Sequence, residues 1–400
     1  MRHPSWCADF DKGCQVRIAL LTESWYPVVN GVTASVRTLA DELMAAGDEV
    51  IIVCPDMPGA DLDPPYVQRV PSWVSPWNTR NPFAYPPYGP LSHRLDNIDV
   101  DIVHSHHPFG LGLYGHRLAR RLGVPHVSTF HTLYFSYIHY SPFPPPVSRW
   151  WLRTVLTQFY SGCALLTVPS KDTENQLRTE MRMPCPMEVH PTGVSLPGVV
   201  DAERADALRL LMGIQPDDRV VLYVGRIAWE KNCRLLLESF ARLPENCHLV
   251  MVGGGPDGDA QAEFAAELGM DRRTHFVGPV SREGLVDYYA MADVFAFPSS
   301  TETQGLVLGE AQSCGLPCVA VTGGGAAEFV RNEIDALVVP PELDAFAGAL
   351  LRIVSDDVLR HKMSGEALAS PVRPTVAEMV SHIRQMYMRL IAEHRIAPGA

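Results

Sequence analysis

Residues 16–47 read VRIALLTESWYPVVNGVTASVRTLADELMAAG. The apolar run at its start predicts a buried β-strand, and Asn30-Gly31 is a turn that opens directly into a helix over residues 33–46. Gly47 then stands where a glycine in the left-handed conformation commonly ends a helix. The stretch therefore predicts one strand–turn–helix unit.

The same unit recurs along the chain. Further short apolar runs, each bounded by turn residues, lie at 49–55, 100–106, 126–131 and 164–170, and then at 219–226, 247–255, 293–300, 317–324 and 335–341. Continuous apolar strands that alternate with helices are typical of parallel sheets covered on both faces. A Pro- and Gly-rich break at 190–201 separates the two series, and 400 residues exceed the usual size of a single core.

We therefore predict an α/β fold of two doubly wound, Rossmann-like domains that face a cleft. The expected parts are an N-terminal extension (1–15), a first domain (16–193), a second domain (194–370) and a C-terminal helix (371–400). The aromatic and proline-rich stretch 71–90 predicts a long irregular loop. In sheets of this kind ligands bind beyond the carboxyl ends of the strands, so the loops at those ends are the candidate site.

Composition excludes several classes of protein. The net charge is −12, shared as 15 basic against 17 acidic residues through Gly193 and 18 against 28 from Val194 onward, which disfavours nucleic-acid binding. The chain contains no apolar run of the length of a membrane span, and its first residues have no apolar signal-peptide core, so we expect a cytoplasmic protein. Nine cysteines without a CxxC pair predict reduced thiols, with Cys314 and Cys318 as packing residues.

Two strand-end loops carry groups that suit phosphates. In VGRIAWEKN, Arg226 and Lys231 leave the same strand end, and a planar guanidinium with a compact ammonium can hold a diphosphate. After the first strand, backbone amides at Gly31 open a helix, which is a natural phosphate seat. The alternatives are a solvated basic loop and an ordinary turn. The glycines at 253–255 either admit a ligand or only make a turn.

Histidines gather at the strand ends of the first half. His104, His106 and His107 follow one predicted strand, and His131 follows the next. No carboxylate or cysteine cluster with ligand spacing accompanies them, so we predict no catalytic metal. A histidine that borders the cleft fits a hydrogen bond to a substrate hydroxyl.

Two glutamates stand eight positions apart in STETQGLVLGEAQSCGLP, residues 300–317. We expect Glu302 in the loop that opens a helix and Glu310 two turns inside that helix, on its cleft side. Each carboxylate can accept two hydroxyl hydrogen bonds, as a sugar diol offers. The alternative is a charge that complements the helix dipole for Glu302 and a surface position for Glu310. Together with Arg226, Lys231 and Gly31 they favour a nucleotide-sugar site.

These residues resemble glycosyltransferase family 4, over nearly the whole chain from Arg17 to about Leu390. The family has the two-lobed GT-B fold and transfers sugars with retention, which implies an acceptor-binding first domain and a donor-binding second domain. The resemblance implies that GRIAWEKN binds phosphates and that NGV supplies an amide. It also implies that Glu302 contacts the donor sugar and Glu310 the ribose. By the same resemblance His131 of STFHT lies at the reacting sugar, Val280 of FVGPVSREGL borders the nucleobase, and the amides at Thr303, Gln304 and Gly305 assist the diphosphate.

Within the family, HHPFGLGLYGHRLARRLGVPHVSTFHTLYFSYIHYSP and TETQGLVLGEA look most like bacterial diacylglycerol glucosyltransferases, and PVRPTVAEM departs from the usual run into the last helix. The resemblance implies a retaining transferase that needs no cofactor or metal and uses UDP-glucose as donor and a lipid such as diacylglycerol as acceptor. Other donors, a phosphatidylinositol or soluble acceptor, a UDP-N-acetylglucosamine epimerase and a non-catalytic sugar-binding protein remain as alternatives. The pattern leaves the oligomeric state open.

A peripheral contact with an anionic membrane is also expected. The first half is nearly balanced in charge, so it can approach an anionic leaflet without strong repulsion. Two tryptophans and two arginines share the helical stretch 147–160, and such residues suit a membrane interface. The alternatives are that this helix packs only against its own sheet and that the aromatic stretch 73–88 makes the contact instead.

Overall fold

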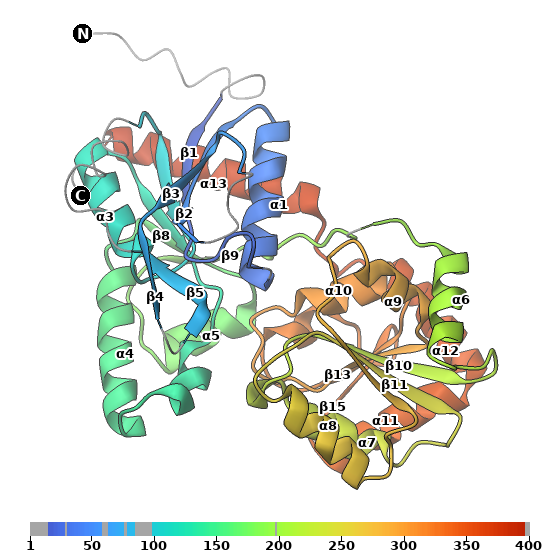
Figure 1. Ribbon diagram of the computed structural model, residues 1–400. Helices are drawn as coiled ribbons and strands as arrows, with labels where there is room; N and C mark the ends of the chain where they lie inside the picture. Colours follow the sequence, from blue (N-terminus) through green and yellow to red (C-terminus); the bar gives the residue numbers. More distant parts are fainter. Residues whose placement is uncertain are drawn as a thin grey trace.

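The computed structural model describes residues 15–28, 30–57, 63–75, 78–84, 98–196 and 198–396. Two separate parallel sheets form the two lobes seen in Figure 1, so the predicted α/β fold of two doubly wound domains is confirmed. The predicted extension 1–15 lies almost wholly outside the described residues.

The first sheet has seven strands in the order β3-β2-β1-β6-β7-β8-β9. Their bounds are β1 Arg17–Leu21, β2 Glu49–Pro55, β3 Val67–Val70, β6 Ile102–Ser105, β7 His126–Thr129, β8 Leu165–Val168 and β9 Met187–Val189. Each pairing is parallel, and β6 and β8 are buried along their whole length, as continuous apolar runs predict. The covering helices are α1 Gly31–Ala45, α3 Leu111–Leu122, α4 Pro145–Tyr160 and α5 Lys171–Thr179, with the 3-10 helix η1 at Tyr134–Tyr140.

The second sheet has six parallel strands in the order β12-β11-β10-β13-β14-β15. Their bounds are β10 Arg219–Val224, β11 Cys247–Val252, β12 Thr274–Gly278, β13 Val294–Phe297, β14 Cys318–Val321 and β15 Ala336–Val339. Around it lie α6 Ala202–Leu211, α7 Cys233–Phe240, α8 Gly258–Glu267, α9 Leu285–Met291, α10 Leu306–Ser313, α11 Leu343–Ser355 and α12 Asp357–Leu368, with the 3-10 helices η2 Trp229–Lys231 and η3 Gly325–Phe329. One apolar cluster fills each face of this sheet.

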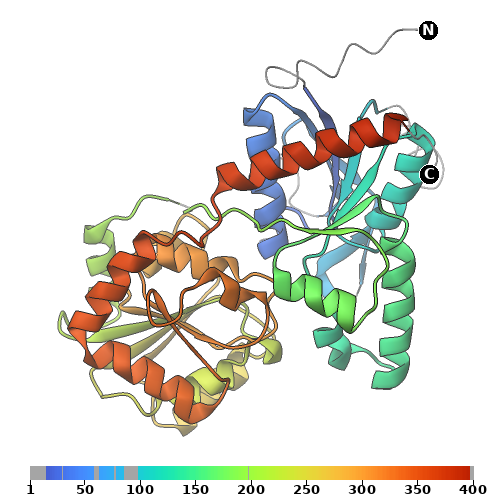
Figure 2. The same ribbon diagram turned by 180° about the vertical axis from the view of Figure 1, so that it is seen from behind.

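The last helix, α13 (Val376–Ile396), returns to the first domain and lies across its back (Figure 2). Its buried face joins the core formed by α1 and β1. Arg384 forms an ion pair with the buried Asp48, at 2.7 Å between Nε and Oδ2. The Thr375 hydroxyl accepts from the Glu378 amide, and the Glu378 carboxylate accepts from the Thr375 amide, so a capping box starts the helix.

The prediction of an irregular loop at 71–90 is wrong over part of its length. Two antiparallel strands, β4 (Ser72–Ser75) and β5 (Asn78–Ala84), form a separate ribbon, while residues 76–77 and 85–90 lie outside the described residues. Proline suggested a loop because it cannot donate to a β-ladder. In a two-stranded ribbon each strand is an edge strand, so a proline at position 82 is tolerated there.

The described helices include none that is long and apolar enough to cross a membrane. Cys314 is partly buried and Cys318 is fully buried, and both are free thiols, as the packing interpretation expects.

Candidate active site

The candidate site lies where each sheet reverses its strand order. In the second sheet the chain runs outward from β10 on one side and from β13 on the other, so their carboxyl ends border a crevice. Arg226 and Lys231 follow β10, and Glu302 follows β13. In the first sheet the reversal falls between β1 and β6, with Gly31 after β1. The sequence motifs therefore stand at the two positions where doubly wound sheets bind ligands.

Lys231 and Glu302 form an ion pair across the crevice of the second sheet. Burial of the ammonium works against its charged form, but the neighbouring Glu302 carboxylate outweighs this effect and raises the pKa of Lys231 above its usual value. The Arg226 guanidinium lies 3.6 Å from the Glu230 carboxylate, and its side chain is 51% exposed. One fixed cation and one accessible cation thus border the same strand end.

The glycines after β11 support this cationic loop. A Cβ on Gly253 would lie 2.0 Å from the Gly225 carbonyl oxygen, and a Cβ on Gly255 would lie 2.0 Å from the Ile227 carbonyl oxygen. No side chain fits at either position, so these glycines let two strand-end loops pack against each other. This close packing is sufficient to explain the two glycines.

The loop before α10 is tied to the first domain. The Thr303 hydroxyl donates to the His131 carbonyl oxygen at 3.2 Å. The Gln304 side chain accepts from the Thr192 amide at 2.8 Å and donates to the Thr192 carbonyl oxygen at 2.7 Å. Gly305 then begins α10 with φ +71°, a left-handed value that favours glycine. The Gln304 side chain therefore joins the two domains, a role that its sequence position did not indicate.

A second cross-domain contact lies beside the first. The Glu328 carboxylate in η3 accepts from the backbone amides of Lys171 at 3.0 Å and Asp172 at 2.5 Å, at the start of α5. An acidic group from one domain thereby caps a helix of the other. Gly325 lies so close to Ser170 that a Cβ would be 2.0 Å from its hydroxyl oxygen. The Glu302 loop is thus held between two interdomain contacts.

Glu310 is nearly buried and faces the other domain. Its carboxylate accepts from the Tyr289 hydroxyl at 2.8 Å, and Arg282 lies 4.0 Å away. Burial raises the pKa of Glu310 above its usual value, while Tyr289 and Arg282 oppose that shift. A small cavity places the glutamate beside residues of α1 and the interdomain crossing: Ala34, Ser35, Thr38, Thr192, Gly193, Val194 and Ser195. Arg282 was not singled out from the sequence, although SREGL contains it.

His131 is held by a neighbouring histidine. Its Nε2 lies 2.9 Å from Nδ1 of His106, and the two rings are stacked with centroids 5.2 Å apart. Burial lowers the pKa of His131 to about 3, so the ring is neutral at physiological pH. His104 lies deeper, bonded to Tyr387 of α13 at 2.5 Å and to Thr129 at 2.6 Å. His131 also accepts, through its backbone carbonyl oxygen, the hydrogen bond from Thr303 in the loop that carries Glu302.

The remaining predicted residues lie around this group. Gly31 is the first residue of α1, with no atom within 4 Å of its ideal Cβ position, and Asn30 caps the helix by accepting from the Thr33 amide at 2.9 Å. Val280 follows β12 and packs partly against the second core. Direct contacts join Lys231 to Glu302, and the next residue, Thr303, to His131.

Buried neutral histidines predict a specific loss of stability in acid. Burial lowers the pKa of His104 and His131 to about 3 and that of His107 to about 4, from a usual value of 6.5. Between the folded-state pKa values and 6.5, only the unfolded chain binds protons at these histidines. Their contribution to the free energy of unfolding is therefore fully present above about pH 6.5 and falls as the pH drops. Glu23, whose pKa burial raises to about 7, opposes this with a single proton. We expect the urea midpoint of the first domain, followed by fluorescence of its buried Trp25, to fall between about pH 6.5 and 5. An unchanged midpoint over that range would contradict the prediction.

Comparison with known proteins gives the same division of the chain. The model described as "Glycosyltransferase Family 4" matches residues 29–196, and the model described as "Glycosyl transferases group 1" matches residues 211–369. The first range contains the strands of the first sheet other than β1, and the second range contains all strands of the second sheet.

Individual relatives cover most of the chain. It is 32% identical over 363 residues to the GDP-mannose-dependent alpha-mannosyltransferase of Mycolicibacterium smegmatis, which covers 88% of this chain and 91% of that protein. It is 29% identical over 319 residues to the alpha-monoglucosyldiacylglycerol synthase of Acholeplasma laidlawii, covering 76% and 80% of the two chains. The crystal structure of Anabaena HepE in complex with UDP-glucose matches 94% of this chain and 100% of its own with a TM-score of 0.73 at 17% identity, which shows a shared fold. The chain therefore belongs to glycosyltransferase family 4 and is a glycosyltransferase with the GT-B fold.

Proposed function

We propose that the protein is a retaining glycosyltransferase that moves glucose from UDP-glucose to a lipid acceptor such as diacylglycerol, without a divalent metal. The observation that carries the proposal is the paired Lys231 and Glu302 at the switch point of the second sheet, with the accessible Arg226 beside them. The Acholeplasma relative is a glucosyldiacylglycerol synthase by name, and HepE was crystallised with UDP-glucose, which supports this donor and acceptor.

In this mechanism the donor diphosphate lies between the two cations. Negative charge grows on the diphosphate as the glycosidic bond breaks, and preorganised positive groups lower the barrier because they need no reorganisation. Arg226, Lys231, the Gly31 amide and the amides at 303–305 fill that role. Glu302 contacts the transferred sugar and orients Lys231, and Glu310 accepts hydroxyl hydrogen bonds from the ribose.

The acceptor hydroxyl attacks on the face from which the diphosphate departs, and it passes its proton to the leaving phosphate oxygen. This course retains the anomeric configuration and needs no covalent nucleophile. His131 is neutral and its ring is fixed by His106, so it can hydrogen-bond a sugar hydroxyl without adding charge. Arg226 and Lys231 can supply the positive charge that a metal ion provides in other enzymes, so we expect catalysis to proceed without one.

An apolar groove in the first domain supports the proposal of a lipid acceptor. The groove has a volume of about 610 Å³ and is lined mainly by aromatic and aliphatic side chains of η1 and α4: Tyr134, Tyr137, Ile138, Ser141, Pro142, Phe143, Val147, Ser148, Trp150, Trp151 and Leu152. One end adjoins the donor site, because the His139 ring of η1 contacts the Trp229 ring in a tilted arrangement, with centroids 4.9 Å apart. Burial raises the pKa of Tyr137, and the charges of Lys231 and Glu302 also act on it. We propose that the acyl chains of the acceptor occupy this groove.

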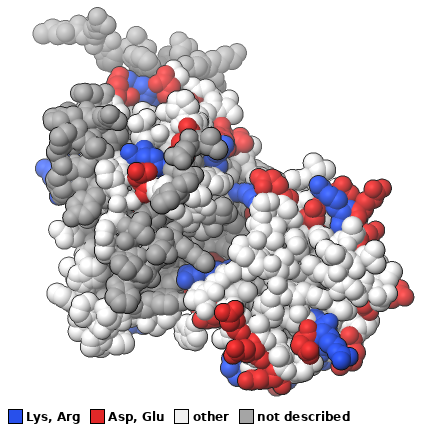
Figure 3. Space-filling view, viewed as in Figure 1, with Lys and Arg blue, Asp and Glu red and all other residues white. Residues whose placement is uncertain are grey.

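Helix α4 divides its apolar side chains between the core and the solvent. Leu152, Leu156 and Phe159 pack inside, whereas Trp150 is 68% exposed and Trp151 is 54% exposed. Packing against its own sheet therefore accounts for only one side of the helix. On the face shown in Figure 3, acidic side chains gather over the second domain, near α6 and α8. These observations favour the first domain as the membrane-facing one.

Vesicle flotation tests this arrangement. The double change Trp150→Ser and Trp151→Ser should weaken binding to phosphatidylglycerol vesicles by at least about tenfold, since each side chain loses apolar area buried in the interface. The matched control is Leu210→Ser with Leu211→Ser, an exposed apolar pair on the second domain at 78% and 82% exposure, which should leave flotation unchanged. Equal loss of flotation in both double variants would contradict a specific role for α4.

A donor screen in the presence of EDTA tests the donor and the lack of a metal requirement together. We expect release of UDP from UDP-glucose, at a rate that added Mg²⁺ or Mn²⁺ does not raise. The M. smegmatis relative favours a second candidate, transfer of mannose from GDP-mannose. Release of GDP alone would select that candidate. Conversion of a UDP-sugar without UDP release would instead indicate an epimerase.

A further inference from the structure

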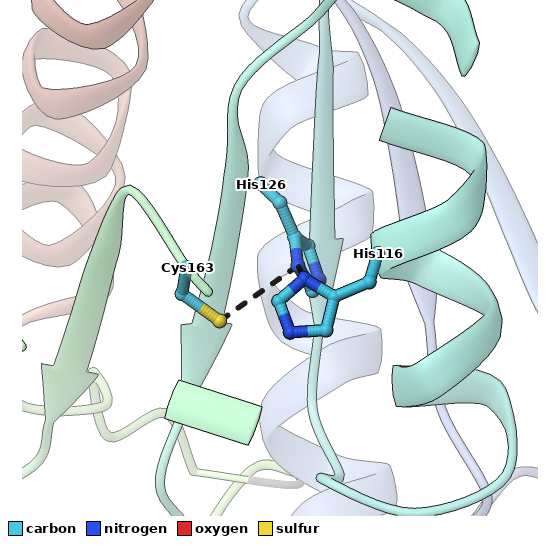
Figure 4. Close-up of side chains that lie close together, drawn as sticks. All are labelled: His116, His126 and Cys163. Atoms are coloured by element: carbon cyan, nitrogen blue, oxygen red, sulfur yellow. Dashed lines mark hydrogen bonds between the residues drawn. The ribbon is translucent and has the colours of Figure 1, made fainter. Parts of the chain in front are cut away.

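A cluster of two histidines and a cysteine lies at the opposite end of the first sheet from the candidate active site. His116 comes from α3, His126 is the first residue of β7, and Cys163 precedes β8. Figure 4 shows the three side chains pointing toward one another. Nδ1 of His126 lies 2.9 Å from Nδ1 of His116 and 3.7 Å from Sγ of Cys163. These three ligand atoms all lie within 4.8 Å of one another.

The hydrogen bonds around the cluster leave both Nδ1 atoms facing each other as lone pairs. Nε2 of His116 is 2.8 Å from the Phe159 carbonyl oxygen, which can only accept, so this nitrogen carries the proton. The Ser128 hydroxyl donates to the Ser105 carbonyl oxygen, and the Ser105 hydroxyl donates to Ser128 Oγ. Ser105 can therefore only accept from Nε2 of His126 at 3.0 Å. Two bare nitrogens at 2.9 Å repel unless a proton or a metal ion stands between them.

Neighbouring residues hold the two rings in this arrangement. A Cβ on Gly162 would lie 2.8 Å from Cε1 of His116, and a Cβ on Gly115 would lie 3.1 Å from Nε2 of His126. The Phe159 ring packs against the His116 ring at 4.7 Å between centroids. Only 4% of His126 and 6% of Cys163 is exposed. A carbonyl or hydroxyl on the distal nitrogen of each histidine is also the usual outer support of a metal-bound imidazole.

We propose that His116 Nδ1, His126 Nδ1 and Cys163 Sγ bind one Zn²⁺ ion as a structural site, with water or a small ligand in the fourth position. Tetrahedral zinc with Zn–N of about 2.0–2.1 Å and Zn–S of about 2.3 Å sets two nitrogens about 3.3 Å apart and nitrogen and sulfur about 3.6 Å apart. The nitrogen–sulfur spacing of 3.7 Å is close to the second value, and the nitrogen–nitrogen spacing of 2.9 Å would widen by about 0.4 Å on metal binding. Mixed imidazole and thiolate donors suit zinc better than magnesium or calcium.

The proposed zinc site lies far from the candidate active site, so the ion would stabilise the fold of the first domain. His126 begins β7 and His131 lies two residues beyond its end, so the two are five residues or roughly 16 Å of extended chain apart. The site would join α3 to the starts of β7 and β8. Burial raises the pKa of the Cys163 thiol far above its usual range, so the free side chain is neutral, and metal binding would release its proton.

Cobalt titration of the metal-stripped full-length chain tests the site, because tetrahedral Co²⁺ with a thiolate ligand absorbs in the visible and near-ultraviolet. We expect saturation at one equivalent, displacement by Zn²⁺, and a higher Tm of the zinc-loaded chain. Cys163→Ser should abolish the thiolate charge-transfer band, and His116→Gln should weaken binding by at least about tenfold. The matched control is Cys54→Ser, another fully buried free thiol of the first domain, which should leave the titration unchanged.

Absence of stoichiometric cobalt binding by the folded wild-type chain would overturn the proposal, leaving a proton shared between the two imidazoles. The proposal would also be overturned if folded Cys163→Ser showed the thiolate charge-transfer band at the same intensity as the wild-type chain. The zinc proposal and the proposed function can fail independently. Turnover of the sugar donor in EDTA, measured per folded molecule, depends only on the interdomain site.

Discussion

The change Arg226→Ala should lower kcat/KM by about 10²–10³ while leaving the fold intact. The guanidinium stands at the carboxyl end of β10, where it can stabilise charge that develops on the donor diphosphate. Its side chain is 51% exposed, but its partner Glu230 at 3.6 Å is buried, so the Tm of the variant must be measured beside its kinetics. Most of the loss should appear in kcat, because the contact strengthens in the transition state.

A neighbouring arginine provides the control for this change. Arg234 is 65% exposed and pairs with Glu238 one turn along α7, so Arg234→Ala removes the same charge without reaching the crevice. Steady-state assays of both variants, with Tm values to show that each is folded, make the comparison. If Arg226→Ala turns over near the wild-type rate, or if Arg234→Ala loses as much, Arg226 does not hold the diphosphate.

Substitution of Glu310 and substitution of Glu302 should have different effects on UDP binding and turnover. Glu310→Gln should weaken UDP binding by about tenfold or more, because a charged acceptor of ribose hydroxyl hydrogen bonds becomes neutral. The glutamine can still accept from Tyr289, so the fold should persist. Glu302→Gln should depress turnover more than UDP affinity, because it removes the partner of Lys231 and a contact to the transferred sugar.

Calorimetric titration of UDP into both variants, combined with kcat measurements, distinguishes the two roles. The expected pattern is weakened UDP binding in Glu310→Gln and reduced kcat with nearly unchanged UDP affinity in Glu302→Gln. Unchanged UDP affinity in Glu310→Gln would refute its ribose contact. The reverse pattern would exchange the two assignments.

Local patterns in the sequence sufficed to predict the central strands of the two sheets, because hydrophobic burial on both faces of a parallel sheet produces continuous apolar runs. The strands β3, β9 and β12 were missed, because they are short or only partly buried and polar residues interrupt them. The proximity of Lys231 and Glu302 could also be predicted, because both residues follow strands whose carboxyl ends meet at one edge of the same sheet. The β4–β5 ribbon was missed because its prolines suggested a loop.

Contacts between distant parts of the chain were not predictable in the same way. Gln304 bonds the Thr192 backbone 112 positions away, and Glu328 caps a helix 156 positions away. Polar side chains such as these carry no local sign of their partner. The cluster of His116, His126 and Cys163 has the same origin, since three separate elements bring it together. Histidine spacing drew attention to HSHH instead, where His104 proved to bond α13.

The central claim is retaining transfer of glucose to a lipid, and product analysis tests it most directly. The enzyme would be incubated with UDP-glucose labelled in the sugar, diacylglycerol in phosphatidylglycerol vesicles, and EDTA, and then extracted with chloroform and methanol. We expect UDP release to equal the label recovered in the organic phase, with the transferred glucose in the α configuration of the donor. Label that stays in water-soluble products, or a β-linked glycolipid, would contradict the account.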